Sequence, residues 1–169
     1  MSTIKFKHVI SRSACASVLA LSFAAAASGA SAGSNLPNAT FESGTDGFSA
    51  RQNETVSRVS TVSYEGDYCL MVSNRKDAWN GAVYSMTTGW TAGETYEFSC
   101  AVRQDSGADV TMQLSLQYSS GGETVYDHIV AASVPSGTWT ILENKAYQIP
   151  ASATGCLLYV ETATDLCDF

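Results

Sequence analysis

The sequence predicts an all-β fold, a two-sheet antiparallel β-sandwich of the jelly-roll type. Short segments rich in Val, Thr, Tyr and Phe recur along the chain, and Gly, Asn, Asp and Ser separate them. No segment of adequate length combines a helical period with capping residues. About nine such strands in roughly 130 residues are typical of a sandwich, with a barrel as the runner-up. We expect strands near 39–42, 56–62, 67–74, 81–87, 95–104, 109–119, 123–134, 139–149 and 155–162.

Two of the expected strands alternate clearly between apolar and polar residues, so one face of each should pack on the core. Turn residues follow each of these strands, at Ser106-Gly107 and at Ser120-Gly121-Gly122, which is consistent with hairpins. The predicted core faces are Tyr96, Phe98, Cys100 and Val102 on one strand, and Met112, Leu114, Leu116 and Tyr118 on the next.

Residues 1–32 have the pattern of a secretory signal peptide. Three basic residues precede an apolar run over 14–27, and the small-residue stretch 29–32 offers a cleavage site. The apolar run is short for a membrane span. The sequence therefore predicts an exported protein, with one domain over 33–169.

Loss of the leader makes the domain strongly acidic. The leader carries three of the nine Lys and Arg residues and none of the sixteen Asp and Glu residues, so six basic residues remain and the net charge is near −10. A surface of this charge repels phosphate backbones and anionic lipid, which argues against nucleic-acid and membrane partners. Neutral polysaccharide stays acceptable.

Four cysteines follow the leader: Cys69, Cys100, Cys156 and Cys167. An even number in an oxidising compartment allows disulfides, yet three lie in the expected strands and Cys167 lies at the apparent start of another, and a cysteine in a strand often serves as a small buried apolar residue. No spacing suggests zinc. The pairing stays open.

Catalytic patterns are scarce in the chain. His128 is the only histidine after the leader, no G-x-S-x-G motif occurs, and so many acidic residues are present that no one pair is informative. We therefore predict a chain without its own catalysis.

Binding leaves clearer traces, because sugar rings stack on aromatic side chains. Trp79 lies in the polar, glycine-terminated segment 74–81, which predicts a position outside the core. Trp139, in a turn sequence, fits the capping of a sandwich edge, and Trp90 beside Gly89 is ambiguous.

Several ordered blocks in the sequence resemble family 22 carbohydrate-binding modules, which are jelly rolls found beside the catalytic domains of endo-xylanases. The resemblance runs from about Asn38 to Phe169, and a related family, numbered 4, is the nearest alternative. The blocks are Phe41 to Phe48, Ser49-Ala50-Arg51, Trp79-Asn80-Gly81-Ala82, Val134 to Trp139, and Tyr159-Val160-Glu161-Thr162.

The resemblance implies a xylan-binding cleft with five side chains. Arg51 would hydrogen-bond sugar hydroxyls, and Trp79 and Tyr126 would stack on sugar rings. Tyr159 and Glu161, spaced by two, would project from one face of the last strand, with Glu161 accepting hydroxyl donors. Plainer alternatives stay open: a surface ion pair for Arg51, a buried strand position for Tyr126, and a solvent-facing position without a special role for Glu161.

The resemblance also implies a structural calcium ion, for which Thr40 and Glu42 match two of the ligand positions. Calcium takes six to eight oxygens. Because the sequence stops at Phe169 on what looks like the start of another strand, we expect a module truncated before its last strand. The usual acidic partner would then lie beyond Phe169.

The resulting interpretation is a secreted, non-catalytic module that binds xylan or a related β-glucan and targets an attached glycoside hydrolase to plant cell wall. Three alternatives remain: an amino-terminal fragment of an endo-1,4-β-xylanase, an adhesive or structural jelly roll that binds protein, and a small glycosidase. The residues do not decide between xylan and mixed-linkage β-glucan.

Overall fold

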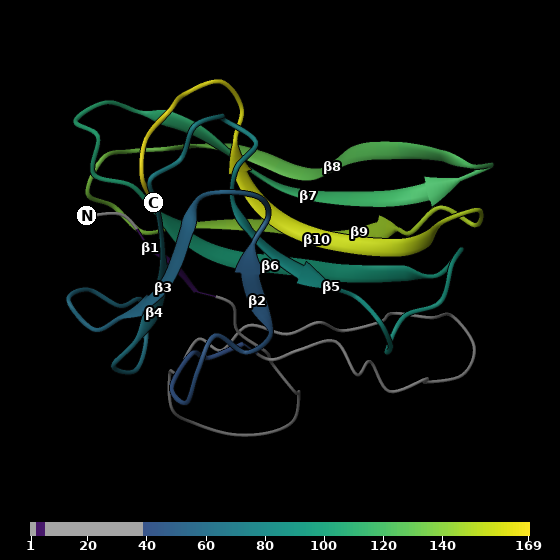
Figure 1. The fold of residues 1–169 in the computed structure, drawn as a ribbon, viewed down its shortest axis with the longest axis horizontal. Coiled ribbons are helices and arrows are strands. Elements are labelled where there is room, and N and C mark those ends of the chain that lie inside the picture. The colour runs from purple at the N-terminus through teal and green to yellow at the C-terminus, as the bar shows by residue number, and fades with distance from the viewer. Residues whose placement is uncertain (1–2, 6–38) are drawn as a thin grey trace.

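The protein is a sandwich of two five-stranded sheets, seen in a computed structural model that describes residues 3–5 and 39–169 (Figure 1). Sheet A has the order β3-β4-β1-β6-β9 and sheet B the order β2-β5-β10-β7-β8, with antiparallel pairing. Within the described ranges no helix is long and apolar enough to cross a membrane. The strands are β1 Thr3–Lys5, β2 Phe48–Ala50, β3 Thr55–Val59, β4 Cys69–Ser73, β5 Ala82–Ser85, β6 Thr95–Arg103, β7 Val110–Ser120, β8 Glu123–Val134, β9 Thr140–Gln148 and β10 Thr154–Thr162.

The core lies between the two sheets, where the alternating residues meet. The predicted core faces are confirmed: on β6 the side chains from Tyr96 to Val102, and on β7 those from Met112 to Tyr118, are at most 8% exposed at every second position. Burial of large apolar side chains from both sheets stabilises the sandwich. The all-β sandwich prediction is therefore confirmed.

The two predicted turns differ in what they connect. Gly121 and Gly122 have φ angles of 60° and 91° and join β7 to β8 as a two-residue hairpin, as expected for a turn that needs two left-handed residues. The hairpin expected at Ser106-Gly107 is wrong. This turn carries the chain from β6 in sheet A to β7 in sheet B, so the strands on its two sides are not paired.

The expected strand at 39–42 is also wrong. Phe41 has a φ of 63°, which no strand residue adopts, and its ring is fully buried. Its amide donates to the Asp46 carboxylate (2.7 Å) and its carbonyl accepts from Arg58 Nε (2.5 Å), which holds the bend. The strand in this region is instead β2, which begins at Phe48 and pairs with β5.

Sheet A takes backbone from both ends of the chain. Of the predicted signal peptide, residues 1–32, only Thr3–Lys5 belong to the described residues; they form β1, between β4 and β6. At the other end, Phe169 exchanges two backbone hydrogen bonds with Val72 of β4 (2.5 and 3.0 Å). Figure 1 accordingly shows the C-terminus beside β3 and β4.

The cysteines, whose pairing the sequence left open, serve as packing residues. Cys100 and Cys156 are free thiols in the core, and Cys167 is a half-buried free thiol. Burial raises the pKa of the Cys156 thiol to about 11 and raises that of Cys100 further. The Cys69 thiol donates to the Val62 carbonyl (2.6 Å).

Gly81, directly before β5, lies in close contact with the backbone of β10. A Cβ atom on Gly81 would lie 1.7 Å from the Val160 carbonyl oxygen, whereas one on Gly44 would meet nothing within 4 Å. We expect Gly81→Ala to lower the free energy of unfolding by more than about 2 kcal/mol and Gly44→Ala to change it by less than about 0.5 kcal/mol. Urea unfolding measures both, and equal effects would contradict the close contact.

Candidate functional site

The outer face of sheet B carries the site. Along β10, Leu158 and Val160 point into the core, while Tyr159 and Glu161 project from the opposite face, as their spacing predicted. The strand registers align Tyr159 with one residue on each of the four remaining strands of the sheet. This row across sheet B consists of Ser49, Val83, Tyr159, Ser115 and His128.

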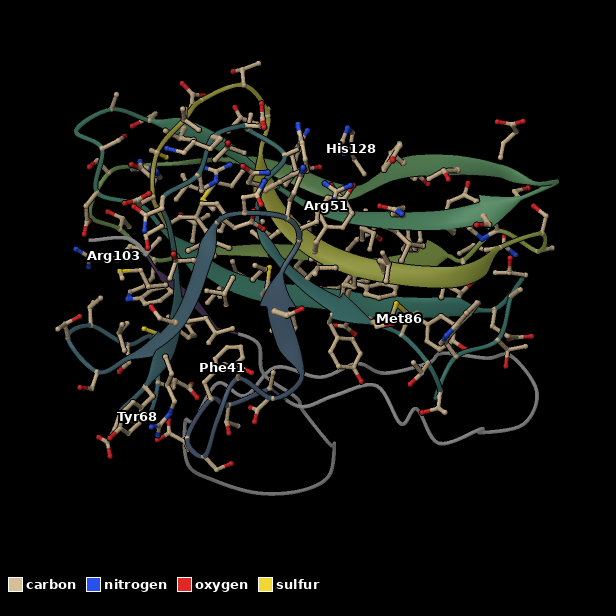
Figure 2. The ribbon with its side chains drawn as sticks, viewed as in Figure 1. Phe41, Arg51, Tyr68, Met86, Arg103 and His128 are labelled. Carbon is tan, nitrogen blue, oxygen red and sulfur yellow. The ribbon has the colours of Figure 1, made fainter. Side chains whose placement is uncertain are left out.

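Two hollows of about 510 Å³ each lie along this face. Arg51, Trp79 and Tyr126 line both, so these three side chains stand where the hollows meet. The first hollow is completed by Ala78, Gln113, His128, Tyr159, Glu161, Thr162 and Ala163, and the second by Gly47, Ser49, Gln52, Val83, Ser85, Gln117 and Leu157. Figure 2 shows the labelled Arg51 and His128 side by side on this face.

Arg51 is the centre of the site. It follows β2 and reaches across the sheet, so that its guanidinium carbon lies 3.7 Å from the centre of the Tyr159 ring. The same carbon is 5.4 Å from the Trp79 ring and 5.5 Å from the Tyr126 ring, which are cation–π distances. The guanidinium donates to the Trp79 carbonyl (3.0 Å), Gln117 Oε1 (3.2 Å) and Glu161 Oε2 (3.5 Å).

Glu161 supplies a negative charge that is 5% exposed. Its second carboxylate oxygen accepts from the Ser115 hydroxyl (2.7 Å) and lies 3.9 Å from His128 Nδ1. Burial raises the pKa of Glu161; the Ser115 hydrogen bond and the charges of Arg51, His128 and Arg75 oppose that shift. Arg51 and Glu161 therefore form an ion pair with each other. The sequence alternative for Arg51 was an ion pair on the surface, and the observed pair lies inside the cleft instead.

Tyr159 lies at the bottom of the site rather than on its surface. The side chain is 1% exposed because Arg51 covers its ring. Burial, with the charge of Glu161 nearby, raises the pKa of Tyr159 to about 12. The phenol is therefore neutral, and its ring supports the guanidinium from below.

The two other predicted aromatics are exposed. Trp79 is 41% exposed on the loop between β4 and β5, and Tyr126 is 59% exposed on β8. The alternative of a buried strand position for Tyr126 is wrong, because the side chain is exposed, whereas that of the neighbouring Val125 packs against the core. Two aromatic faces are thus available beside Arg51 for contact with an apolar surface.

The remaining tryptophans lie outside the cleft. Trp139 packs its ring on Tyr64 (5.6 Å between centres), which agrees with an edge-capping role. Trp90, ambiguous from the sequence, lies against the core and donates its indole N–H to the Met86 carbonyl (2.6 Å).

Sequence reasoning missed four polar residues that β7 and β8 contribute to the site, although one of them carried a readable signal. His128 is two residues after Tyr126 on the same strand and therefore on the same face. The others come from β7, between β8 and β10, and could be found only from the order of strands in the sheet. The four are Gln113, Ser115, Gln117 and His128.

Of the two residues expected to bind calcium, Glu42 has other partners. The Glu42 carboxylate accepts from the amides of Asp67 (3.1 Å) and Tyr68 (3.3 Å), and its carbonyl accepts from Arg58. Over the described ranges no group of three or more His, Cys, Asp or Glu side chains could hold a metal ion. Thr40 and Glu42 alone do not make the oxygen shell that calcium requires, so the calcium ion stays a prediction.

Comparison with known proteins identifies the family to which this fold belongs. The model of the carbohydrate binding domain family matches residues 33–166. The chain belongs to this family. It is a carbohydrate-binding module, and the outer face of sheet B, with its aromatic and hydrogen-bonding side chains, is its candidate cleft.

Similar proteins include carbohydrate-binding modules with solved structures and xylanases. The C-terminal family 22 carbohydrate-binding module of a Clostridium thermocellum xylanase is 35% identical, with a TM-score of 0.73 over 76% of this chain and 83% of that one. A xylan-binding domain of family 22 is 36% identical, with a TM-score of 0.73 over 76% of this chain and 85% of that one. A xylanase/beta-glucanase of Ruminococcus flavefaciens is 39% identical over 131 residues, and endo-1,4-beta-xylanase A of Thermotoga maritima is 35% identical over 134 residues. The matches cover 76% and 77% of this chain but only 16% and 13% of those two proteins.

The raised pKa of Glu161 predicts a pH dependence of stability. A carboxyl group whose folded-state pKa lies above its unfolded value stabilises the fold below the unfolded pKa, and this contribution is lost as the pH rises through the folded pKa. Glu161→Gln lacks the titration. We expect the stability of the unsubstituted module to fall relative to this variant as the pH rises from acidic to neutral, measured by urea unfolding. If the free energy of unfolding of the unsubstituted module instead rises relative to that of Glu161→Gln over this pH range, the pKa of Glu161 is lowered in the folded state.

Proposed function

We propose that the module binds single chains of xylan, or of a related β-glucan, in the cleft of sheet B. The observation that carries this proposal is the arrangement of a partly buried Arg51–Glu161 pair between two exposed aromatic rings, those of Trp79 and Tyr126. The named relatives, which include a xylan-binding domain and several xylanases, support the same class of ligand.

The chemistry of the cleft suits an uncharged sugar chain. Trp79 and Tyr126 would stack on the apolar C–H faces of two sugar rings. The guanidinium of Arg51 would donate to hydroxyl oxygens, and the Glu161 carboxylate would accept from hydroxyl groups, with charge-assisted hydrogen bonds in both cases. The two hollows on either side of Arg51 give an extended polymer room to continue in both directions.

In the whole protein, the module would act as a targeting unit for an attached catalytic domain. The chain spans less than a fifth of the length of the xylanases that it matches, so the remainder of such proteins lies outside it. Binding to the cell wall would raise the effective concentration of a linked glycoside hydrolase at its substrate. An endo-1,4-β-xylanase is the attached enzyme that the relatives favour.

Calorimetric titration with xylohexaose and cellohexaose tests the proposed ligand. We expect xylohexaose to bind, and Trp79→Ala to weaken its binding by at least about tenfold, about 1.4 kcal/mol, because a stacking face is lost. Trp139→Ala is the matched control, since this tryptophan packs on Tyr64 outside the cleft, and it should bind normally.

Two other results would redirect the proposal. Binding of cellohexaose with the greater affinity would favour a β-glucan over xylan as the ligand. The absence of heat with either sugar, from folded protein, would remove the glycan ligand and favour the adhesive jelly roll that binds protein.

The proposed export can be tested separately. We expect the chain, expressed in a host with a general secretion pathway, to be cleaved after Ala32, so that mass spectrometry of the exported product finds a chain that starts at Gly33 and therefore lacks β1. Retention of the intact chain inside the cell would contradict the signal peptide. Arg12→Glu, which replaces a positive charge of the leader by a negative one, should slow export without changing the cleavage position.

A further inference from the structure

Two buried charged residues outside the cleft hold the loop that carries Trp79. This tryptophan loop, residues 74–81, connects β4 and β5. Trp79 itself is 41% exposed, whereas Arg75 at one end of the loop is 5% exposed. Glu54, at the end of the turn after β2, is also 5% exposed. Buried charges are costly unless each is well hydrogen-bonded.

Arg75 binds the loop from inside. Its guanidinium donates to the carbonyls of Ala78 and Asn80 (2.8 Å for Asn80), on either side of Trp79. It also donates to the Thr162 hydroxyl at the end of β10 (2.8 Å) and to the Cys167 carbonyl. One planar group thus fixes both neighbours of Trp79 relative to the strand that carries Glu161.

Glu54 binds the loop to the strand that precedes Arg51. One carboxylate oxygen accepts from the backbone amides of Arg51 (2.5 Å) and Gly81 (3.1 Å), and both oxygens accept from the amide of Gln52 (3.2 and 3.3 Å). The Arg51 amide also donates to the Gly81 carbonyl (3.1 Å). The backbone of Arg51 is therefore joined directly to the last residue of the tryptophan loop.

We propose that Glu54 and Arg75 are positioning residues, which set the Trp79 ring at its distance from the Arg51 guanidinium and so control glycan affinity without touching the ligand. Neither residue lines the hollows. The proposal rests on the proposed function, because its effect on affinity requires that the cleft bind a glycan. Its effect on the position of Trp79 does not depend on a ligand.

The substitutions that test this keep the size of each side chain. Glu54→Gln removes the negative charge and one of the two acceptor oxygens, so the hydrogen bonds from the amides of Arg51, Gln52 and Gly81 lose their charge assistance. Arg75→Lys keeps the charge but loses the planar set of donors. Glu123→Gln, on the exposed β7–β8 turn, is the matched control.

The first measurement needs no sugar. With 5-fluorotryptophan in the protein, three ¹⁹F resonances report Trp79, Trp90 and Trp139. We expect Glu54→Gln and Arg75→Lys to shift or broaden the Trp79 resonance and to leave that of Trp139 unchanged. If Glu54→Gln does not fold, Arg75→Lys carries the test.

The second measurement is the affinity for xylohexaose in a double-mutant cycle. We expect each substitution to weaken binding by about fivefold or more in the presence of Trp79, and by less than about twofold in the Trp79→Ala background, as coupled residues behave. An unmoved Trp79 resonance, or equal losses with and without Trp79, would overturn the positioning role. Absence of binding in the unsubstituted module would instead count against the proposed function, and the ¹⁹F result would still decide the positioning of Trp79.

Discussion

The burial of a carboxylate on the outer face of sheet B is the constraint on which the rest of the site depends. Glu161 is 5% exposed, and a charge so far from water needs partners. Ser115 comes from the neighbouring strand, but Arg51 comes from β2, at the edge of the sheet, and must reach past β5 to meet it. The ion pair therefore forms only when β2, β5 and β10 are paired in this order, so this part of the site assembles with the sheet.

The aromatic residues around this pair divide into a support and a contact surface. Tyr159 lies beneath the guanidinium, where the ring restricts how Arg51 can tilt, while Trp79 and Tyr126 stay exposed on its flanks. The hydrogen bonds from Arg51 to Gln117 and to the Trp79 carbonyl restrict it further. A donor that is held before the ligand arrives loses less conformational freedom on binding, which favours affinity in a shallow cleft.

Much of this arrangement follows from the sequence, because a strand exposes alternate residues to alternate faces. That rule places Tyr159 with Glu161 and would have placed His128 with Tyr126. It fails where the backbone leaves the extended region, as at Phe41, whose left-handed bend depends on the distant Arg58. It also cannot say which strands are neighbours, so the contributions of β7 to the site were not predictable.

A β-bulge in β8 changes which of its residues face outward, and the alternation of residues in the sequence does not reveal it. Counted by twos from Tyr126, Val130 would continue the exposed face after His128. Instead the register shifts between Leu114 and Ser115 of β7, so that Ser115 pairs with His128 and Leu114 with Val130. Both Ile129 and Val130 then pack on the core. A β-bulge of this kind changes which alternate residues lie on each face, so after His128 the outer face of β8 is formed by Ala131 and Ser133, while Val130 and Ala132 pack on the core.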